Sequence, residues 1–332
     1  MTGSSQSIIS DALAVVMRGC KVDLPTAIAL SLLQGSDLWQ LFAAAGRIRE
    51  RFRGTSVDIC SIVNAKSGAC SEDCAYCAQS VHHATGAPVY PLIAVPDIVK
   101  AAQNAREYGA RRFCIVTSGP GIDSREELET IARGVGEVRS LGLSPCATLG
   151  TLTREQLSIL KRAGLERYHH NIETSRDYFP RVCTTHRFED RLEVLRNART
   201  LGLSACSGGI LGMGETMQDR LQMAFTLREL DVESVPINFL MPIPGTPLEH
   251  VPSITPLDAL HAIALFRFIL PEKEIRICAG RGTVLRRLHP LIFPAGADGF
   301  MIGNYLTTTG LDPAEDLAMI RDLGLQARTR HA

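Results

Sequence analysis

The feature that most constrains the fold is a regular alternation, from about residue 57 to residue 303, of short apolar runs with amphipathic helical stretches. Short, nearly continuous apolar runs predict buried parallel strands. Eight β/α units in series predict an α/β fold, a (β/α)8 TIM-type barrel with right-handed crossovers. A doubly wound open sheet is the alternative, because periodicity does not distinguish closure. The predicted strands are 57–63, 112–116, 145–149, 167–172, 204–210, 234–239, 275–278 and 299–303, and the predicted helices 93–108, 125–141, 153–163, 187–201, 217–230 and 256–270.

Both ends of the chain predict helices outside the barrel. Apolar residues at helical spacing predict an N-terminal helical cap over residues 1–54, with Asp23 before Leu24 and Pro25 as a helix N-cap. A last helix is expected over 312–325, within a C-terminal extension of 306–332. The barrel domain, which would carry all of the chemistry, is therefore expected to span residues 55–305.

Composition indicates a soluble enzyme without a charged partner. Lys plus Arg and Asp plus Glu both number 35, so no global field attracts nucleic acid or an anionic membrane. The first residues lack a basic n-region, so no signal peptide is expected, and no apolar run reaches the roughly 20 residues of a membrane helix. Ten cysteines in such a chain favour metal or redox chemistry over disulfides, and a cytoplasmic location is expected.

Three thiols are concentrated in one short stretch. Cys70, Cys74 and Cys77 form C-x3-C-x2-C, and thiolates are soft ligands suited to zinc or to iron–sulfur clusters. A closed zinc site wants four protein ligands, but no fourth cysteine lies nearby. The spacing resembles the signature of the radical S-adenosylmethionine (SAM) superfamily, in which SAM chelates the fourth iron of a cubane. A zinc loop or an electron carrier is the alternative from another class.

More cysteines lie in or near the ends of other predicted strands. Cys114, Cys146, Cys206 and Cys278 could each be a small buried hydrophobe, but several on different strands could converge as a second metal site. Arg281 follows them, and from the residues alone we interpret it as a salt-bridge or substrate-carboxylate residue, because a protonated guanidinium is a poor metal ligand.

Polar residues also line the predicted strands 4 to 6. Period 2 places His169, Asn171 and Glu173 on one side of a strand, where they suit the ribose hydroxyls and amino group of a ligand such as SAM. The glycine-rich stretch 208–215 lets backbone approach a ligand closely. Asn238, between apolar neighbours, is a candidate substrate contact.

Taken together, six segments resemble the biotin synthases, radical SAM enzymes that insert sulfur into dethiobiotin. A hydrogenase-maturation or pyrrolysine-pathway member of the same group is the nearest alternative, but those lack this set of auxiliary cysteines with Ala-Gly-Arg. The segments are 66–80 (KSGACSEDCAYCAQS), 147–152 (ATLGTL), 171–175 (NIETS), 206–210 (CSGGI), 234–238 (SVPIN) and 279–281 (AGR).

The resemblance implies a homodimeric barrel that converts dethiobiotin to biotin with two SAM-derived 5'-deoxyadenosyl radicals and sulfide from an auxiliary cluster. It also implies a reducing partner such as flavodoxin or ferredoxin, and iron–sulfur assembly machinery. By motif position it assigns a catalytic [4Fe-4S] cluster to Cys70, Cys74 and Cys77; an auxiliary [2Fe-2S] cluster to Cys114, Cys146, Cys206 and Arg281; SAM to Tyr76, Asn171, Glu173, Gly209 and Glu215; and substrate to Lys66, His169 and Asn238.

The chain departs from the family pattern at several positions. Glu173 stands where many members have Asp, and His169 stands where an Asn is common. Cys60 and Cys278 are additional thiols near the predicted barrel interior, which could change the auxiliary ligand set. Cys183 is assigned to no cluster.

Overall fold

The computed structural model describes residues 5–122 and 124–328. The expectation about a signal peptide draws on residues 1–4, and the end of the predicted extension covers residues 329–332, so both lie outside the described part. Among the described helices, none is long and apolar enough to cross a membrane.

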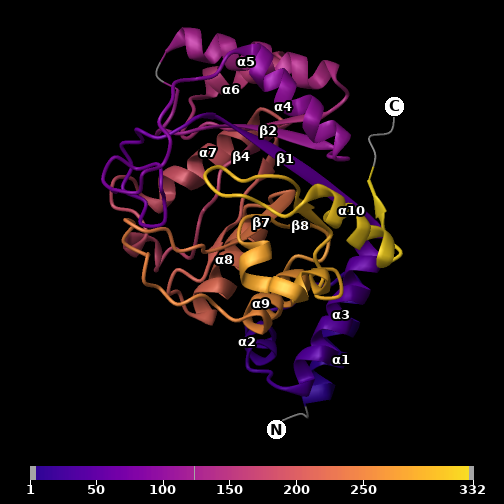
Figure 1. Cartoon of the computed structure of the whole chain (residues 1–332). Coiled ribbons are helices and arrows are strands. Elements are labelled where there is room, and N and C mark those ends of the chain that lie inside the picture. Colours follow the sequence, from indigo (N-terminus) through magenta and orange to yellow (C-terminus); the bar gives the residue numbers. More distant parts are fainter. Residues whose placement is uncertain (1–4, 123, 329–332) are drawn as a thin grey trace.

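Eight parallel strands form a closed barrel, as predicted, and the alternative of an open sheet is wrong (Figure 1). Each strand pairs with the next around the ring, and Asp58, Ile59 and Cys60 of the first strand pair with Gly299, Phe300 and Met301 of the last. The ring consists of β1 (Ser56–Lys66), β2 (Arg112–Thr117), β3 (Ser144–Thr148), β4 (Arg167–His169), β5 (Ser204–Cys206), β7 (Ser234–Phe239), β8 (Glu274–Ile277) and β9 (Gly299–Met301). Because all eight strands are parallel, their carboxyl ends meet at one mouth.

Helices surround the ring and cap it. Thr153 and Thr216 open two of the outer helices with capping boxes, which satisfy the first free backbone N–H groups. The predicted N-cap is confirmed, because Thr26 N donates to Asp23 Oδ1 at 3.0 Å. The outer helices are α4 (Val95–Glu107), α5 (Arg125–Ser140), α6 (Arg154–Arg162), α7 (Phe188–Thr200), α8 (Met217–Glu229) and α9 (Pro256–Ile269); α1 (Ser5–Met17), α2 (Leu24–Ser31) and α3 (Ser36–Arg53) precede β1, and α10 (Pro313–Asp322) follows β9.

Apolar side chains fill the space between strands and helices, whereas the barrel interior also holds charged side chains. Phe113, Val235 and Phe300 are fully buried in the hydrophobic core. In contrast, Asp58 and Arg276 are buried charges on barrel strands. Burying charge is costly unless it is paired or used. Asp58 and Arg276 pair with each other, so these buried charges are compensated inside the barrel.

The element boundaries differ from the prediction most clearly where a glycine allows two backbone segments to approach closely. The run predicted over 204–210 is split into β5 and a second short strand, β6 (Gly209–Leu211). Between them, a Cβ on Gly208 would lie 1.8 Å from the Pro236 carbonyl oxygen, so only glycine allows this close approach. A π-helical turn, Arg281–Leu285, and a 3-10 segment, Arg286–Ile292, were not predicted, nor was β10 (Gln326–Ala327), which pairs with the start of β1.

Candidate active site

The three-cysteine loop leaves β1 at the mouth of the barrel. Cys70, Cys74 and Cys77 are free thiols that line one cavity of about 390 Å³. Short local bonds shape the loop: Cys77 N donates to the Cys74 carbonyl oxygen at 2.9 Å, and Val81 N donates to that of Cys70 at 2.8 Å. The structure therefore brings the three predicted metal-ligating thiols to one place.

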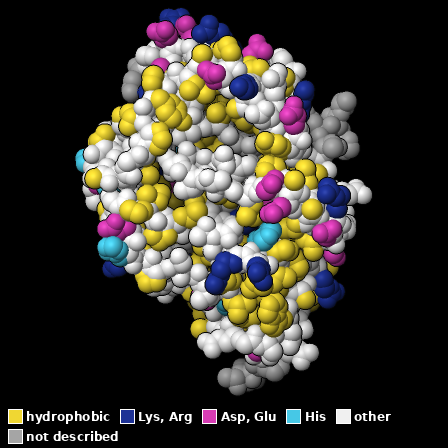
Figure 2. Space-filling model, in the orientation of Figure 1, with side chains coloured by type: hydrophobic (Ala, Val, Ile, Leu, Met, Phe, Trp, Pro, Cys, Tyr) yellow, Lys and Arg dark blue, Asp and Glu magenta, His cyan; other side chains and the backbone are white. Residues whose placement is uncertain are grey.

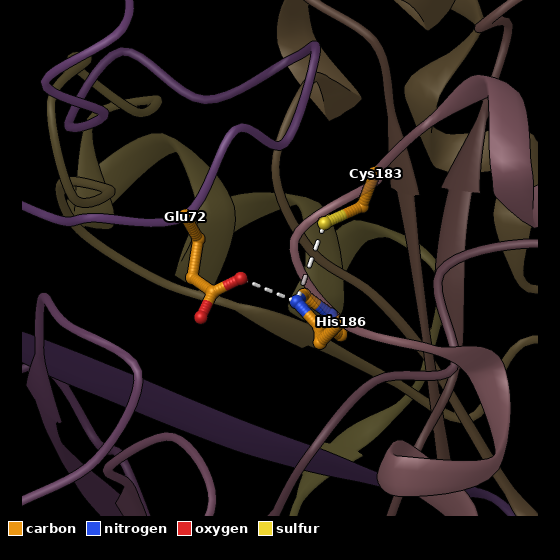
Figure 3. A group of neighbouring side chains, drawn as sticks. All are labelled: Glu72, Cys183 and His186. Atoms are coloured by element: carbon orange, nitrogen blue, oxygen red, sulfur yellow. Dashed lines mark hydrogen bonds and ion pairs between the residues drawn. The ribbon is translucent and has the colours of Figure 1, made fainter.

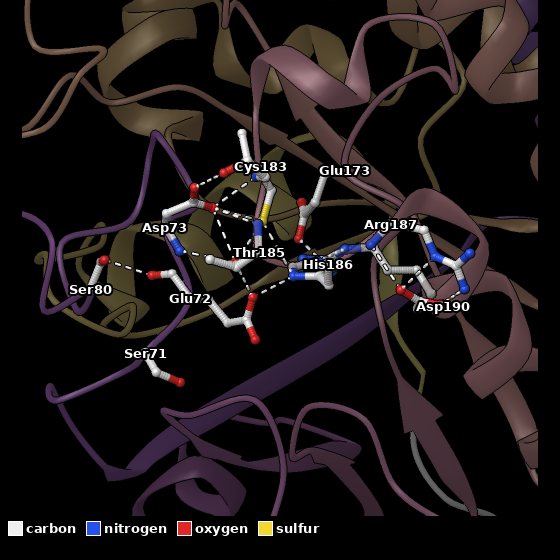
Figure 4. A network of polar contacts seen from close by, with 12 residues as sticks. Ser71, Glu72, Asp73, Ser80, Glu173, Cys183, Thr185, His186, Arg187 and Asp190 are labelled. Carbon is white, nitrogen blue, oxygen red and sulfur yellow. Dashed lines mark hydrogen bonds and ion pairs between the residues drawn. The ribbon is translucent and has the colours of Figure 1, made fainter.

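Two acidic residues between these cysteines anchor the loop to the segment that precedes α7 (Figure 4). Asp73 Oδ1 accepts hydrogen bonds from Thr184 N at 2.9 Å and from Cys183 Sγ at 3.1 Å. Burial alone would raise the pKa of Asp73, but the hydrogen bonds from Thr184, Cys183 and Thr185 lower it well below its usual value. Asp73 is thus an ionised anchor that orients the loop.

Glu72, Cys183 and His186 converge as the ligands of a metal ion would, with their donor atoms within 4.8 Å of one another (Figure 3). Their hydrogen bonds favour another interpretation. Arg191 Nε donates to His186 Nε2 at 2.9 Å, so in the neutral imidazole the proton lies on Nδ1. Nδ1 lies 2.5 Å from Glu72 Oε2 and 3.2 Å from Cys183 Sγ. Both ring nitrogens of His186 are thus engaged in hydrogen bonds with protein groups, so we interpret this group as a second anchor of the loop.

A polar row faces the loop from the end of β4. Tyr76 OH donates to Glu173 Oε1 at 2.8 Å, and Asn171 Nδ2 donates to Glu173 Oε2 at 3.3 Å. Arg191, buried on α7, donates to the Asn171 carbonyl oxygen at 2.9 Å and lies 3.4 Å from Glu173 Oε1. All four line the cavity. The row combines carboxylate, amide and guanidinium groups, which suits a ligand with hydroxyl, amino and carboxylate groups.

Glu173 is held in a backbone conformation that a non-glycine residue rarely adopts. Its φ is 68°, in the left-handed region. Ile210 N donates to the Glu173 carbonyl oxygen at 2.9 Å, and a Cβ on Gly209 would lie 2.1 Å from that oxygen. Gly209 therefore acts by letting the two backbones meet, and its contribution to the site passes through Glu173.

Five thiols lie inside the barrel, below the loop. Cys114 and Cys146 are paired in the β2–β3 register, and Cys206 pairs with His169 in the β4–β5 register. A hydrogen bond from Cys114 lowers the pKa of Cys146 to about 7. Burial raises the pKa of Cys206 to about 11. All five thiols are free, buried and directed at the same cavity, the remaining two being Cys60 and Cys278.

The structure does not bring Arg281 to these thiols. Arg281 is fully buried, and its Nη2 donates to Asp316 of α10 at 2.8 and 2.6 Å, outside the residues that line the cavity. Arg276 lines the cavity instead. Strand parity explains the difference, because Arg276 and Cys278 are two residues apart at the end of β8, whereas Arg281 lies in the π-helical turn beyond it.

Cations form the floor beneath the thiols. Arg276 Nη2 donates to Asp58 Oδ1, and Arg167 Nη1 donates to Glu274 Oε2 at 2.6 Å. Among the described residues, Arg112 Nε and Nη1 and Arg276 Nε are buried without a hydrogen-bond partner. Unpaired buried donors are costly, so this floor is suited to an anionic ligand.

His169 links Thr148 of β3 to Asn171 of the polar row. Its Nδ1 lies 2.7 Å from Thr148 Oγ1, and its Nε2 lies 2.8 Å from Asn171 Oδ1. Burial lowers the pKa of His169 to about 4, so the ring is neutral. Asn238 also lines the cavity, where its Oδ1 accepts from Ala279 N at 3.0 Å.

Two other predicted contacts lie outside the cavity lining. Lys66 Nζ pairs with Glu127 Oε1 at 2.8 Å. Both carboxylate oxygens of Glu215 are engaged, accepting from Gly212 N at 2.8 Å, from Met213 N at 2.7 Å and from Arg220 Nε of α8 at 2.7 Å. Neither side chain is free to meet a ligand in this arrangement.

Residues near the C-terminus complete the mouth and were not predicted. Leu306, Thr307 and Thr308 line the cavity, and Asn64 Nδ2 of β1 donates to the Leu306 carbonyl oxygen at 3.2 Å. The repeated threonines offer hydroxyl donors. On the molecular face in Figure 2, acidic and basic side chains are interspersed, in keeping with the balanced charge of the sequence.

The comparisons with known proteins match this arrangement. Residues 65–227 match the radical SAM superfamily, and residues 236–326 match the biotin and thiamin synthesis associated domain. The barrel is similar to that of methylornithine synthase (TM-score 0.84, 18% identity, 96% of this chain and 97% of that one) and of the hydrogenase maturase HydG (0.82, 15%, 99% and 77%). Fold and thiol loop thus define a radical SAM enzyme, a class whose domain implies a [4Fe-4S] cluster and SAM as cofactors.

Sequence relatives identify the family within this class. The chain is 51% identical over 314 residues to the biotin synthase of Geobacter sulfurreducens, covering 94% of this chain and 95% of that one. It is 50% identical over 311 residues to the biotin synthase of Trichlorobacter lovleyi, covering 93% of each. The chain belongs to the biotin synthase family.

Proposed function

We propose that this chain inserts sulfur into dethiobiotin to form biotin, with a [4Fe-4S] cluster on the loop thiols and an auxiliary [2Fe-2S] cluster inside the barrel. One observation carries the proposal. The loop thiols and the barrel thiols line the same cavity of about 390 Å³. Hydrogen bonds run from Tyr76 of the loop through Glu173 and Asn171 to His169, which pairs with Cys206 in the β4–β5 register. A zinc loop or an electron carrier would need only the first set.

The residues fit both clusters. Cys70, Cys74 and Cys77 supply three thiolates and leave one iron open to SAM. Cys114, Cys146 and Cys206 supply three more above a cationic floor whose Arg112 and Arg276 donors lack partners among the described residues. An anionic thiolate cluster would satisfy these donors. We propose Arg276, in place of Arg281, as the arginine beside the auxiliary cluster.

The [4Fe-4S] cluster supplies, when bound, the electron that cleaves SAM to methionine and the 5'-deoxyadenosyl radical. The protein holds the reactants. The hydroxyl and amino groups of SAM would be oriented by Glu173, Asn171 and Tyr76. Arg191 would hold the Glu173 carboxylate in place. The neutral His169 and Asn238 would face the substrate, between SAM and the barrel thiols. Alignment of this kind turns an intermolecular hydrogen abstraction into an intramolecular one.

The cavity wall also protects the reaction. Ile62, Val116, Ile210 and Leu240 are apolar residues of its lining, so few water molecules compete for a carbon radical. Thr307 and Thr308 at the mouth offer hydroxyl donors for a substrate carboxylate, a role that Lys66 could share only if it left Glu127. Dethiobiotin, which is apolar along its chain and polar at both ends, suits this lining.

The proposal also covers the partners, the oligomeric state, the location and the domains of the protein. The reaction requires a one-electron donor such as flavodoxin or ferredoxin, and iron–sulfur assembly machinery to load the clusters. We further propose a homodimer in the cytoplasm, built of a helical cap (1–54), a barrel (55–305) and an extension (306–332). The extension contributes Thr307 and Thr308 to the cavity, so it would be part of the catalytic unit.

The test is anaerobic turnover of the reconstituted protein with SAM, dithionite and dethiobiotin, in which 5'-deoxyadenosine and biotin are quantified by mass spectrometry. Cys70→Ala should abolish SAM cleavage, whereas Cys206→Ala should retain some uncoupled cleavage without biotin. The exposed Cys20 provides the control variant, Cys20→Ala, which should behave as the wild type. Equal loss of both products in the two cavity variants would contradict separate roles for the two sets of thiols.

A further inference from the structure

Cys60 and Cys278 are two barrel thiols for which a two-iron cluster on three cysteines and an arginine has no use. They are 5% and 2% exposed, on β1 and immediately after β8. Both line the cavity together with Cys114, Cys146 and Cys206, so they face its space and not the packed layer between strands and helices.

The two thiols flank the last strand of the barrel, β9, which pairs with β1 on one side and with β8 on the other. Cys60 pairs with Met301 in the β1–β9 register, and Cys278 N donates to the Ile237 carbonyl oxygen at 2.8 Å, which fixes Cys278 at the end of β8. Ile277, the residue before Cys278, pairs with Phe300, the residue before Met301, so the two thiols lie at the same level of the barrel. Both line the cavity that Cys114, Cys146 and Cys206 also line. The five thiols therefore surround one space.

Arg276, the arginine in this ring, is bound as a cation. Its Nη2 donates to Asp58 Oδ1 and, at 3.4 Å, to Glu274 Oε2. A guanidinium must lose a proton before its nitrogen can bind a metal, and two carboxylates oppose that loss. Thiolates are the better iron ligands, and Cys60 and Cys278 line the same cavity as Arg276.

We propose that Cys60 and Cys278 are iron ligands of the barrel site, so that the auxiliary cluster of this chain holds more iron than, and takes the place of, the [2Fe-2S] cluster proposed above. This inference rests on the proposed function, because it extends the ligand set of the auxiliary cluster. Five thiolates are enough to ligate about four irons, whereas Cys114, Cys146 and Cys206 alone suit about two. Arg276 then acts as a counter-charge beneath the cluster.

The test removes the loop cluster so that only barrel iron is counted. A Cys70→Ala, Cys74→Ala, Cys77→Ala background is reconstituted anaerobically with iron-57 and sulfide, and its iron, acid-labile sulfide and Mössbauer spectrum are compared with and without Cys60→Ser and Cys278→Ser. We expect bound iron to fall about twofold when both serines are present, with a changed spectrum. The control Cys20→Ser, at an exposed cysteine, should leave both unchanged.

Other outcomes separate this inference from the proposed function. Equal iron content and identical spectra with and without the serines would overturn the ligand role of Cys60 and Cys278 while keeping the auxiliary cluster. Absence of barrel iron from a background that still folds, as judged by circular dichroism and by thermal unfolding, would overturn the auxiliary cluster itself. Serine nearly preserves the size of cysteine, so the variants should retain the fold.

Discussion

Replacing Asp316 with Asn tests whether Arg281 is a structural residue or a cluster ligand. Arg281 is fully buried and Asp316 is equally inaccessible, and two hydrogen bonds join Nη2 to the carboxylate at 2.8 and 2.6 Å. Asp316→Asn leaves the guanidinium buried without its counter-charge. If Arg281 serves only to dock α10 against the barrel, the variant should lose stability and keep its clusters.

The magnitude follows from the burial. Breaking a buried ion pair by removing one partner costs about 3–5 kcal/mol, and we expect the low end because the Asn oxygen still accepts one hydrogen bond. A change of ~1 kcal/mol shifts the unfolding midpoint of a large domain by ~2–4 °C. The predicted decrease is therefore about 6–12 °C.

The assay is thermal unfolding of the cluster-free protein by circular dichroism, paired with the electronic absorption and electron paramagnetic resonance spectra of the reconstituted protein. Asp322→Asn, at an exposed position of the same helix, is the control and should unfold like the wild type. A variant with wild-type stability but an altered auxiliary-cluster spectrum would refute the reasoning, because Arg281 would then reach the cluster.

Two further predictions concern SAM binding and pH. Arg191→Lys removes a planar guanidinium that contacts Asn171 and Glu173, and should weaken SAM binding in calorimetry about 10-fold, or ~1.4 kcal/mol; the exposed neighbour variant Arg187→Lys is the control, and equal affinity in the two variants would contradict a role for Arg191. His261 is buried, with Nε2 3.1 Å from the Leu30 carbonyl oxygen, and burial lowers its pKa below 6.5. The unfolded state therefore binds the proton more tightly, so the contribution of the neutral ring to stability is complete above about pH 6.5 and is lost as the pH falls toward the folded pKa. The unfolding free energy of wild-type protein should decrease more steeply on acidification than that of His261→Gln, and parallel curves from urea titrations would rule this out.

The fold could be predicted from the sequence because its signals are local. Eight apolar runs separated by helical patterns are arranged most simply as a closed barrel. The observed strands fall on all eight runs. The missed details depend on contacts distant in sequence. The split between β5 and β6 arises because Gly208 meets Pro236, and no local pattern shows that approach.

The site, too, could be predicted only where its signals are local in the sequence. Cysteine spacing identified the loop thiols, and position in or near the ends of predicted strands identified the barrel thiols. Strand parity, applied to Arg276 and Cys278, would have favoured Arg276 over Arg281. Arg191 was missed because one buried arginine on an amphipathic helix has no distinguishing local signal. Thr307 and Thr308 were missed because only tertiary folding brings the extension to the mouth.

The central claim is that the barrel thiols hold the sulfur that enters the product. The most direct measurement reconstitutes the protein with sulfur-34 sulfide, removes free sulfide, and determines by mass spectrometry the isotope in biotin formed during a single turnover. We expect biotin that carries sulfur-34 from the wild type, and no labelled biotin from Cys206→Ala. Unlabelled biotin from fully labelled protein would contradict it.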